Sequence, residues 1–171
     1  MKKISALFVS LLMLAATTGT AWAQEYKVGF VNTAKLLEST PHAKAARDLL
    51  AKEFKSRDEL LVSGKKALSK DEDMLSKDGA IMSESARRDL ERSIRDQKRD
   101  LKRSQEEFRE DFNIRRNEEL RKLQRTVYDA ITAEAKSQKF DIVMGEGVIF
   151  ASTRVDLTEA VMKRLKAEFG K

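Results

Sequence analysis

The stretch from Glu84 to Lys136 most constrains how this chain can fold, because it contains neither proline nor glycine. Its apolar side chains recur at steps of three, four and seven, which places them on one face of a single long helix. These side chains are Leu90, Ile94, Leu101, Phe108, Phe112, Leu120, Leu123, Val127 and Ile131. Most of the other residues are charged. A helix with one thin apolar seam requires a partner helix along that seam and water on its other faces.

A second helical segment begins at Pro41 and carries a matching seam. Ser39 or Thr40 can cap it, with the proline at the first helical position. The seam consists of Ala43, Ala46, Leu50, Phe54, Leu61, Leu68 and Leu75, the spacing of a left-handed coiled coil. Gly64 lies inside this helix. It is either a weak spot, costing about 1 kcal/mol relative to alanine, or a flex point in the rod.

Turn residues between 76 and 82 interrupt the apolar pattern, and Ser83 can cap the helix that follows. The chain therefore folds back here as an antiparallel helical hairpin with its tip near residues 76–82. Matching the two seams predicts that Leu68 lies opposite Leu90 and that Phe54 lies opposite Ser104. The arm should then be about 50 Å long.

This register places the start of the first helix opposite residues 115–117, where the second helix loses its heptad spacing. Phe108, Phe112, Arg116 and Leu120 are each four residues apart. Such a run shifts the seam, so the helix should change packing partner near this point. We therefore expect a free arm over residues 41–117 and an anchored stem from Leu120.

The remaining residues, 24–40 and 118–171, should form a small β-rich body. Residues 26–31 are typical of a strand, while 140–144 and 148–151 are typical of two strands joined as a hairpin. Asp156 and Glu159 have the spacing of a capping box for a final helix. So small a sheet is marginal alone, which favours oligomerisation. The residues expected to build the shared body are Val28, Phe30, Ile142, Val143, Val148, Ile149 and Phe150.

Residues 1–23 have the pattern of a secretory signal peptide: a basic start, an apolar run over 4–16 and the cleavage pattern Ala21-Trp22-Ala23. The alternative is a membrane-anchored N-terminus. Removal of Lys2 and Lys3 with the signal lowers the formal net charge from +6 to +4. A basic excess commonly indicates nucleic-acid binding, but export argues against it and favours acidic partners outside the cytoplasm.

The sequence offers little that could support catalysis. It contains no cysteine, and His42 is its only histidine, which excludes thiol catalysis and the usual zinc sites. We expect His42 to be an exposed surface residue. The carboxylates are scattered along solvated helices, without a predicted cleft that would raise a pKa. We therefore expect neither an enzyme nor a cofactor or metal site.

The charged arm offers a candidate binding surface. Its residues are Lys77, Arg87, Arg88, Arg92, Arg95 and Arg99. They form either a solvated, salt-bridged face or a positive field that attracts acidic polypeptides and anionic lipid headgroups. The first three, near the tip, are the candidate contact for an anionic glycolipid such as lipopolysaccharide. Ile81 and Met82 either cap the end of the hairpin or offer adaptable apolar contacts to a client.

The order of these elements resembles the Skp/OmpH periplasmic chaperones. The resemblance covers the mature chain and is carried by the strand at 27–32, the segments 142–143 and 148–151, and the closing segment 155–161. It implies an α+β, mostly α fold in which the hairpin arm projects from a small β-body formed by trimerisation. It also implies an ATP-independent periplasmic holdase that encloses unfolded outer-membrane proteins between three arms. The alternatives are a structural or adaptor coiled coil of the cell envelope and, from basic charge alone, a nucleic-acid binder.

Overall fold

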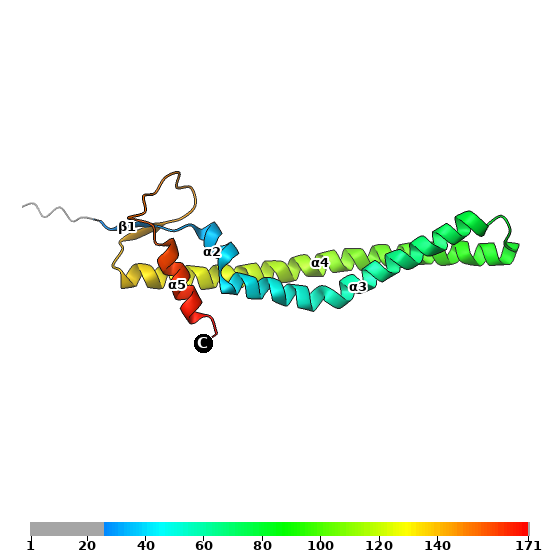
Figure 1. Ribbon diagram of the computed structural model, residues 1–171, viewed down its shortest axis with the longest axis horizontal. Coiled ribbons are helices and arrows are strands. Elements are labelled where there is room, and N and C mark those ends of the chain that lie inside the picture. Colours follow the sequence, from blue (N-terminus) through cyan, green and yellow to red (C-terminus); the bar gives the residue numbers. More distant parts are fainter. Residues whose placement is uncertain (1–25, 171) are drawn as a thin grey trace, which may run out of the picture.

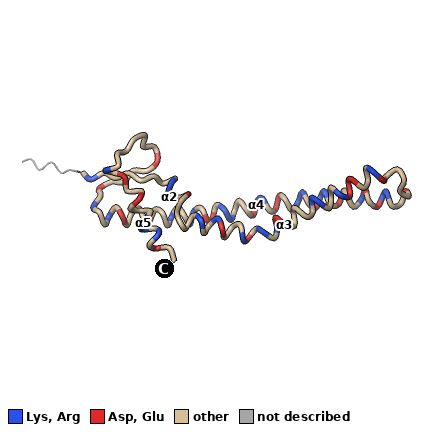
Figure 2. Tube along the Cα trace, viewed as in Figure 1, with Lys and Arg blue, Asp and Glu red and all other residues tan. Residues whose placement is uncertain are grey.

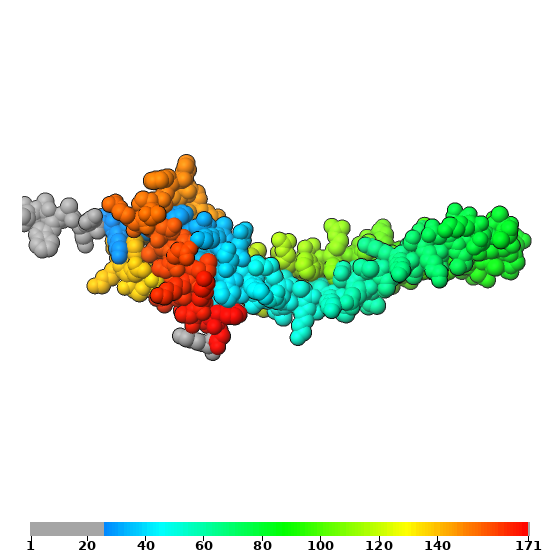
Figure 3. Space-filling view, viewed as in Figure 1, coloured from blue at the N-terminus to red at the C-terminus, as the bar shows by residue number. Residues whose placement is uncertain are grey.

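The computed structural model describes residues 26–170, which form a long helical hairpin extending from a small body (Figure 1). The body is a broad knob and the arm is narrow along its whole length (Figure 3). The expected signal peptide, residues 1–23, lies outside the described residues. The predicted class, α+β and mostly α with a long helical hairpin, is confirmed.

The hairpin consists of α3 (Pro41–Asp78) and α4 (Glu84–Ser137). Both helices begin as their sequences predict. The Thr40 side chain accepts a hydrogen bond from the Ala43 backbone N–H, and Pro41 occupies the first turn. Ser83 caps α4 by accepting the N–H of Ala86. Capping satisfies N–H groups that have no partner inside a helix, so these residues set where each helix begins.

The predicted register of the hairpin is wrong by about one heptad. The Phe54 ring packs edge-on against Phe108 and Phe112, with centroids 5.5 and 5.2 Å away, rather than lying opposite Ser104. Arg57 on α3 forms a salt bridge with Asp111 on α4 at 2.7 Å, in agreement with this register. A slip of seven residues leaves both apolar seams facing each other, so seam matching alone cannot distinguish the two registers.

Because the register differs from the prediction, the start of α3 also packs against a different part of α4. Ala43, at the start of α3, belongs to the same buried cluster as Leu123 and Val127 of α4. The expectation that α3 begins opposite residues 115–117 is therefore wrong. Figure 1 shows α3 crossing from one side of α4 to the other toward the tip, as expected for supercoiled helices.

The body contains a two-stranded parallel sheet of β1 (Val28–Phe30) and β2 (Ile142–Met144). On its other side, β1 is extended by hydrogen bonds from Phe30 N–H to the Val155 carbonyl and from Leu157 N–H to the Phe30 carbonyl. The predicted hairpin with residues 148–151 is wrong, because that segment forms no strand. Strands joined by a long crossover can pair in parallel, and here the crossover is the whole arm.

Two further helices close the core of the body. They are α2 (Thr33–Ser39) and α5 (Thr158–Glu168). Their buried apolar residues meet those of β1 and of the α4 stem, as predicted for the stem. The largest buried side chains in this cluster are Val31, Leu36, Leu157, Val161, Met162 and Leu165, together with Leu123 and Val127.

The capping box predicted for α5 does not form. Asp156 accepts the N–H of Thr158 through its side chain, but the cap residue is Leu157. Glu159 instead binds the Lys35 ammonium at 2.6 Å. The partner on α2 lies 124 positions away in the chain, so a local pattern could not reveal it.

Candidate functional site

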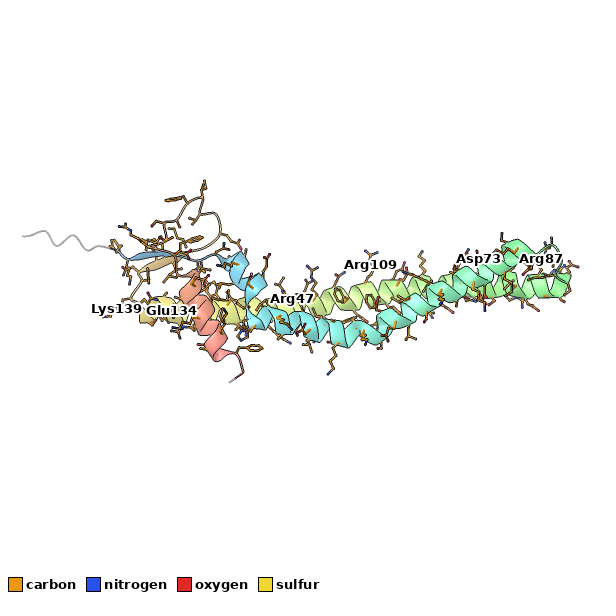
Figure 4. The ribbon with its side chains drawn as sticks, in the orientation of Figure 1. Arg47, Asp73, Arg87, Arg109, Glu134 and Lys139 are labelled. Carbon is orange, nitrogen blue, oxygen red and sulfur yellow. The ribbon has the colours of Figure 1, made fainter. Side chains whose placement is uncertain are left out.

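The tip of the arm exposes an apolar side chain beside basic ones. Ile81, in the loop between α3 and α4, is 86% exposed, whereas Met82 is half-buried. Lys77 lies exposed in the last turn of α3. Arg87 lies in the first turns of α4, at the tip (Figure 4). The structure therefore brings Lys77 and Arg87 to the same end of the arm, as the sequence predicts.

Three of the six basic residues predicted on the arm have acidic partners in the described chain. Arg88 pairs with Glu84, Arg87 pairs with Glu91 at 3.7 Å, and Arg99 pairs with Asp96 at 2.9 Å. Figure 2 shows Lys and Arg interspersed with Asp and Glu along the arm. Such exposed pairs contribute little stability, and their cations stay accessible to a stronger anionic partner.

Two arginines of the predicted set have no such pair. Within residues 26–170, neither Arg92 nor Arg95 forms a salt bridge, and both side chains are exposed. They lie nearly one turn apart on α4, between Arg88 and Arg99. The exposed face of α4 thus combines a solvated, salt-bridged surface with two guanidinium groups that remain available for an anion.

A polar cluster at the root of the arm was not predicted from the sequence. Arg115 on α4 binds Glu53 of α3 at 3.1 Å and also binds Glu118 and Glu119. Lys122 approaches Glu119 to 2.7 Å. This hydrogen bond, together with Arg115, lowers the pKa of Glu119 below its ordinary value of 4.5. The cluster fixes α3 against α4 where the arm meets the body.

His42 is not the exposed surface residue that its position in the first turn predicts. Its ring is half-buried and meets Phe169 edge-on, with centroids 4.9 Å apart. Its Nδ1 atom is buried without a hydrogen-bond partner in the described chain. The apolar residue at the far end of the chain gives no local signal, so this contact could not be foreseen.

The body presents a second candidate surface, and it is apolar. On β2, Ile142 is 51% exposed and Met144 is 44% exposed. The loop after β2 carries Ile149, which is fully exposed, and Phe150, which is 84% exposed. Several large apolar side chains exposed on one small body are typical of an interaction site.

The predicted body residues fall into two groups. Val28, Phe30 and Val143 are half-buried in the paired strands, next to exposed Ile142. Val148, Ile149 and Phe150 lie in the loop and do not join the sheet. Tyr128, which is 73% exposed, lines the groove beside Ile142 and Met144 and was missed because it does not follow the seam pattern.

A groove of about 710 Å³ runs between β2 and the stem of α4. Its apolar lining includes Leu37, Tyr128, Ile131, Phe140 and Met144. The same chain therefore carries both an apolar groove and an apolar loop that projects into solvent.

The described chain shows no arrangement typical of a metal centre or a membrane span. Within residues 26–170, no group of three or more His, Cys, Asp or Glu side chains is placed to hold a metal ion. None of the helices in the described part of the chain is both long and apolar enough to cross a membrane.

Comparison with known proteins decides the family. The family model described as outer membrane protein (OmpH-like) matches residues 27–165. The chain belongs to the OmpH-like family. The resemblance found in the sequence is thereby confirmed, and it covers both the arm and the body.

Relatives of this OmpH-like chain include proteins named chaperone protein Skp, a non-enzymatic role. The one from Pectobacterium atrosepticum is 28% identical over 156 residues, which is 91% of this chain and 93% of the relative. The one from Blochmanniella pennsylvanica is 29% identical over 143 residues, covering 82% and 86%. A crystal structure of an OmpH-like protein from Caulobacter crescentus CB15 has the same fold, with a TM-score of 0.72, 16% identity and coverage of 85% and 86%.

Proposed function

We propose that this protein is an ATP-independent holdase chaperone of the periplasm that keeps unfolded outer-membrane proteins from aggregating before membrane insertion. The observation that carries the proposal is the match of this chain to relatives named chaperones. Its elongated charged arm and its body with exposed apolar residues are consistent with that role. The expected signal peptide supports export.

The working form that we propose is a homotrimer built through the body. The exposed loop with Ile149 and Phe150, and the groove between β2 and α4, lie on one chain and differ in shape. When a projection of one copy enters a groove of the next, the contact is head-to-tail and can close into a ring. This assembly would cover the sheet residues Val28, Phe30, Ile142 and Val143 and the loop residue Val148.

Three arms that project from one body would enclose a cavity for the client. An unfolded β-barrel protein exposes the apolar residues of its lipid-facing surface, which makes it prone to aggregation in water. Many weak contacts from the arms would hold it by multivalency, without any tight site. Arg92, Arg95 and Arg99 would attract acidic segments, and Ile81 and Met82 would make adaptable apolar contacts.

Lys77, Arg87 and Arg88 at the tip form the proposed contact for anionic lipid or lipopolysaccharide. Because Arg87 and Arg88 form only exposed pairs, and Lys77 forms no salt bridge within residues 26–170, a phosphate-bearing surface could compete for them. Nucleic acid is not proposed as a partner.

Light scattering of a urea-unfolded outer-membrane protein, diluted with and without the chaperone, tests the activity. We expect suppression of aggregation at one trimer per client, and weaker suppression when Arg92 and Arg95 are replaced by glutamine. The control substitutes Arg109, an exposed arginine midway along α4 (Figure 4). Unchanged aggregation at stoichiometric trimer would refute the holdase, and would favour an envelope spacer or adaptor with a folded partner.

A further inference from the structure

The end of α5 lies against the base of the arm, far from it in the chain. Figure 1 shows α5 crossing the stem of α4 toward the start of α3. The helix itself is firmly held, because Leu165 is fully buried and Arg164 binds Glu134 of α4 at 2.8 Å. Phe169, which ends the helix, places its ring edge-on against His42 of α3.

Phe169 forms one wall of a small pocket at this base, which we call the root pocket. The pocket has a volume of about 210 Å³ and lies between the first turns of α3 and the stem of α4. Its apolar lining consists of Ala45, Ala46, Leu49, Leu123 and Phe169. Pockets for drug-sized ligands usually hold about 300–1,000 Å³, so the root pocket suits a single apolar side chain.

The packing of Phe169 at this site is incomplete. Its side chain is 46% exposed, and Leu49 in the same pocket is 45% exposed. Hydrophobic stabilisation grows with the apolar area removed from water, so a half-exposed ring obtains only part of it. The next residue, Gly170, has a φ of 92°, which glycine adopts readily. The ring can therefore leave the pocket while the buried part of α5 stays in place.

The same contact is also weakened by a polar atom. His42 Nδ1 is buried and has no hydrogen-bond partner in the described chain. A polar atom that loses water without gaining a partner opposes its own burial. Departure of the Phe169 ring, whose centroid lies 4.9 Å from that of the imidazole, opens the imidazole to water. The hydrophobic gain of the contact is thus partly offset, and its closed and open states are close in free energy.

We propose that Phe169 is a releasable cover of the root pocket. In the closed state, which the structure shows, its ring packs against His42. In the open state the ring turns into water, and the pocket binds an aromatic or large aliphatic side chain of an unfolded polypeptide. The chemistry of this occupant follows from the present one, because a surface that accepts a phenyl ring from its own chain accepts the same group from another.

The role of this polypeptide as a client rests on the proposed function. The cover itself does not, because it follows from the packing of α5 on the base of the arm. Phe169 then competes with the client for one apolar surface, and the client binds only the fraction of molecules in which the pocket is open.

Binding of a short peptide to the mature protein tests the proposal. The probe is an acetylated and amidated Gly-Gly-Phe-Gly-Gly peptide, and the same peptide with alanine in place of phenylalanine is the ligand control. Binding is followed by NMR through the methyl resonances of Ala45 and Ala46. We expect Phe169→Ala to bind the phenylalanine peptide about fivefold more tightly than the unsubstituted protein, because the closed fraction lowers the apparent affinity. The alanine peptide should bind neither protein.

Further variants separate a cover from a residue that only stabilises the fold. His42→Leu removes the unpartnered nitrogen and keeps an apolar surface for the ring, so it should favour the closed state and weaken binding. Phe169→Tyr keeps the ring and should bind as the unsubstituted protein does. Lys166→Ala, at an exposed position of α5, is the matched control and should leave the affinity unchanged.

Hydrogen exchange without peptide supplies a second readout. In Phe169→Ala, amides of residues 158–165 should stay protected, because Val161 and Leu165 remain buried, while the amides that follow them exchange faster. If Phe169→Ala instead unfolds the body, the difference in affinity between His42→Leu and the unsubstituted protein decides the question.

Equal or weaker binding of the phenylalanine peptide by a folded Phe169→Ala, or an affinity that His42→Leu leaves unchanged, would overturn the cover. That result would leave the holdase untouched, because aggregation is measured separately with the Arg92 and Arg95 variants. Conversely, peptide binding that depends on Phe169 in a protein that fails to suppress aggregation would refute the proposed function and retain this inference.

Discussion

Glu119 is the one charged side chain that is buried among residues 26–170, with 8% of its surface exposed. It lies where α3, α4 and the body meet, and Arg115 and Lys122 hold its carboxylate. A buried charge is tolerated only when it is paired and hydrogen-bonded, so this residue depends on its partners. The geometry makes Glu119 a structural residue of the arm root rather than a reactive group.

Two paired carboxylates, one at the arm root and one in the body, predict how stability depends on pH. Lys122 lowers the pKa of Glu119, and Gln138 and Arg164 lower the pKa of Glu134, both from an ordinary value of 4.5. Stability from these groups is therefore fully present above about pH 4.5 and is lost as pH falls through the lowered folded-state values. We expect the urea concentration at the unfolding midpoint to decrease as the pH is lowered below 4.5. This decrease should be less steep in Glu119→Gln than in the unsubstituted protein. A slope that the substitution leaves unchanged would contradict this assignment.

Gly29 in β1 is required by close packing. A Cβ there would lie 2.6 Å from the Leu157 side chain and 3.0 Å from Phe140. We expect Gly29→Ala to destabilise the body by about 1–3 kcal/mol, the usual penalty of overpacking, measured by urea denaturation. Gly64→Ala is the matched control, because its Cβ makes only an ordinary contact and it should not destabilise.

At the scale of elements, the hairpin depends on one aromatic cluster. Phe54 packs edge-on against Phe108 and Phe112, and these two rings stack with centroids 6.0 Å apart. Other seam contacts toward the tip involve smaller or partly exposed side chains. This cluster therefore sets the register and supplies much of the stability of the proximal arm.

Removal of the ring should loosen the arm locally. We expect Phe54→Ala to lower the opening free energy of amides near residues 50–57 by about 3 kcal/mol, as cavity-forming substitutions do. Leu60→Ala, on the same helix but 70% exposed, should change it by less than about 0.5 kcal/mol. Hydrogen exchange reports both, and equal effects would show that the cluster does not hold the arm.

Elements with local signals were predictable, whereas their pairing was not. Thr40 and Ser83 cap the arm helices as their types and positions indicate. The predicted register of the hairpin was wrong because a slip of one heptad leaves the apolar seams of α3 and α4 facing each other. The strand predicted at 148–151 does not form, because β1 pairs instead with β2, on the other side of the arm in the chain. Glu159 does not form the predicted capping box, because it binds Lys35 of α2.

At the scale of the whole molecule, the surface of the arm differs in chemistry from the surface of the body. Along the arm, Lys and Arg are interspersed with Asp and Glu (Figure 2). The body exposes apolar residues on β2 and in the loop that follows it. The roles predicted for the basic residues of the arm and for the body residues stay predictions. The groove beside α4 could not be predicted, because residues 31–37 and 124–146, which lie far apart in the chain, form it together.

The central claim is that three chains assemble through this body to hold one unfolded client. Native mass spectrometry of the mature protein at micromolar concentration, with and without a urea-unfolded outer-membrane protein, tests it most directly. We expect the mass of a trimer alone and of a trimer plus one client. Phe150→Asp should shift the protein to monomer, because a charge would have to enter an apolar groove. A stable monomer of the unsubstituted protein that binds no client would contradict it.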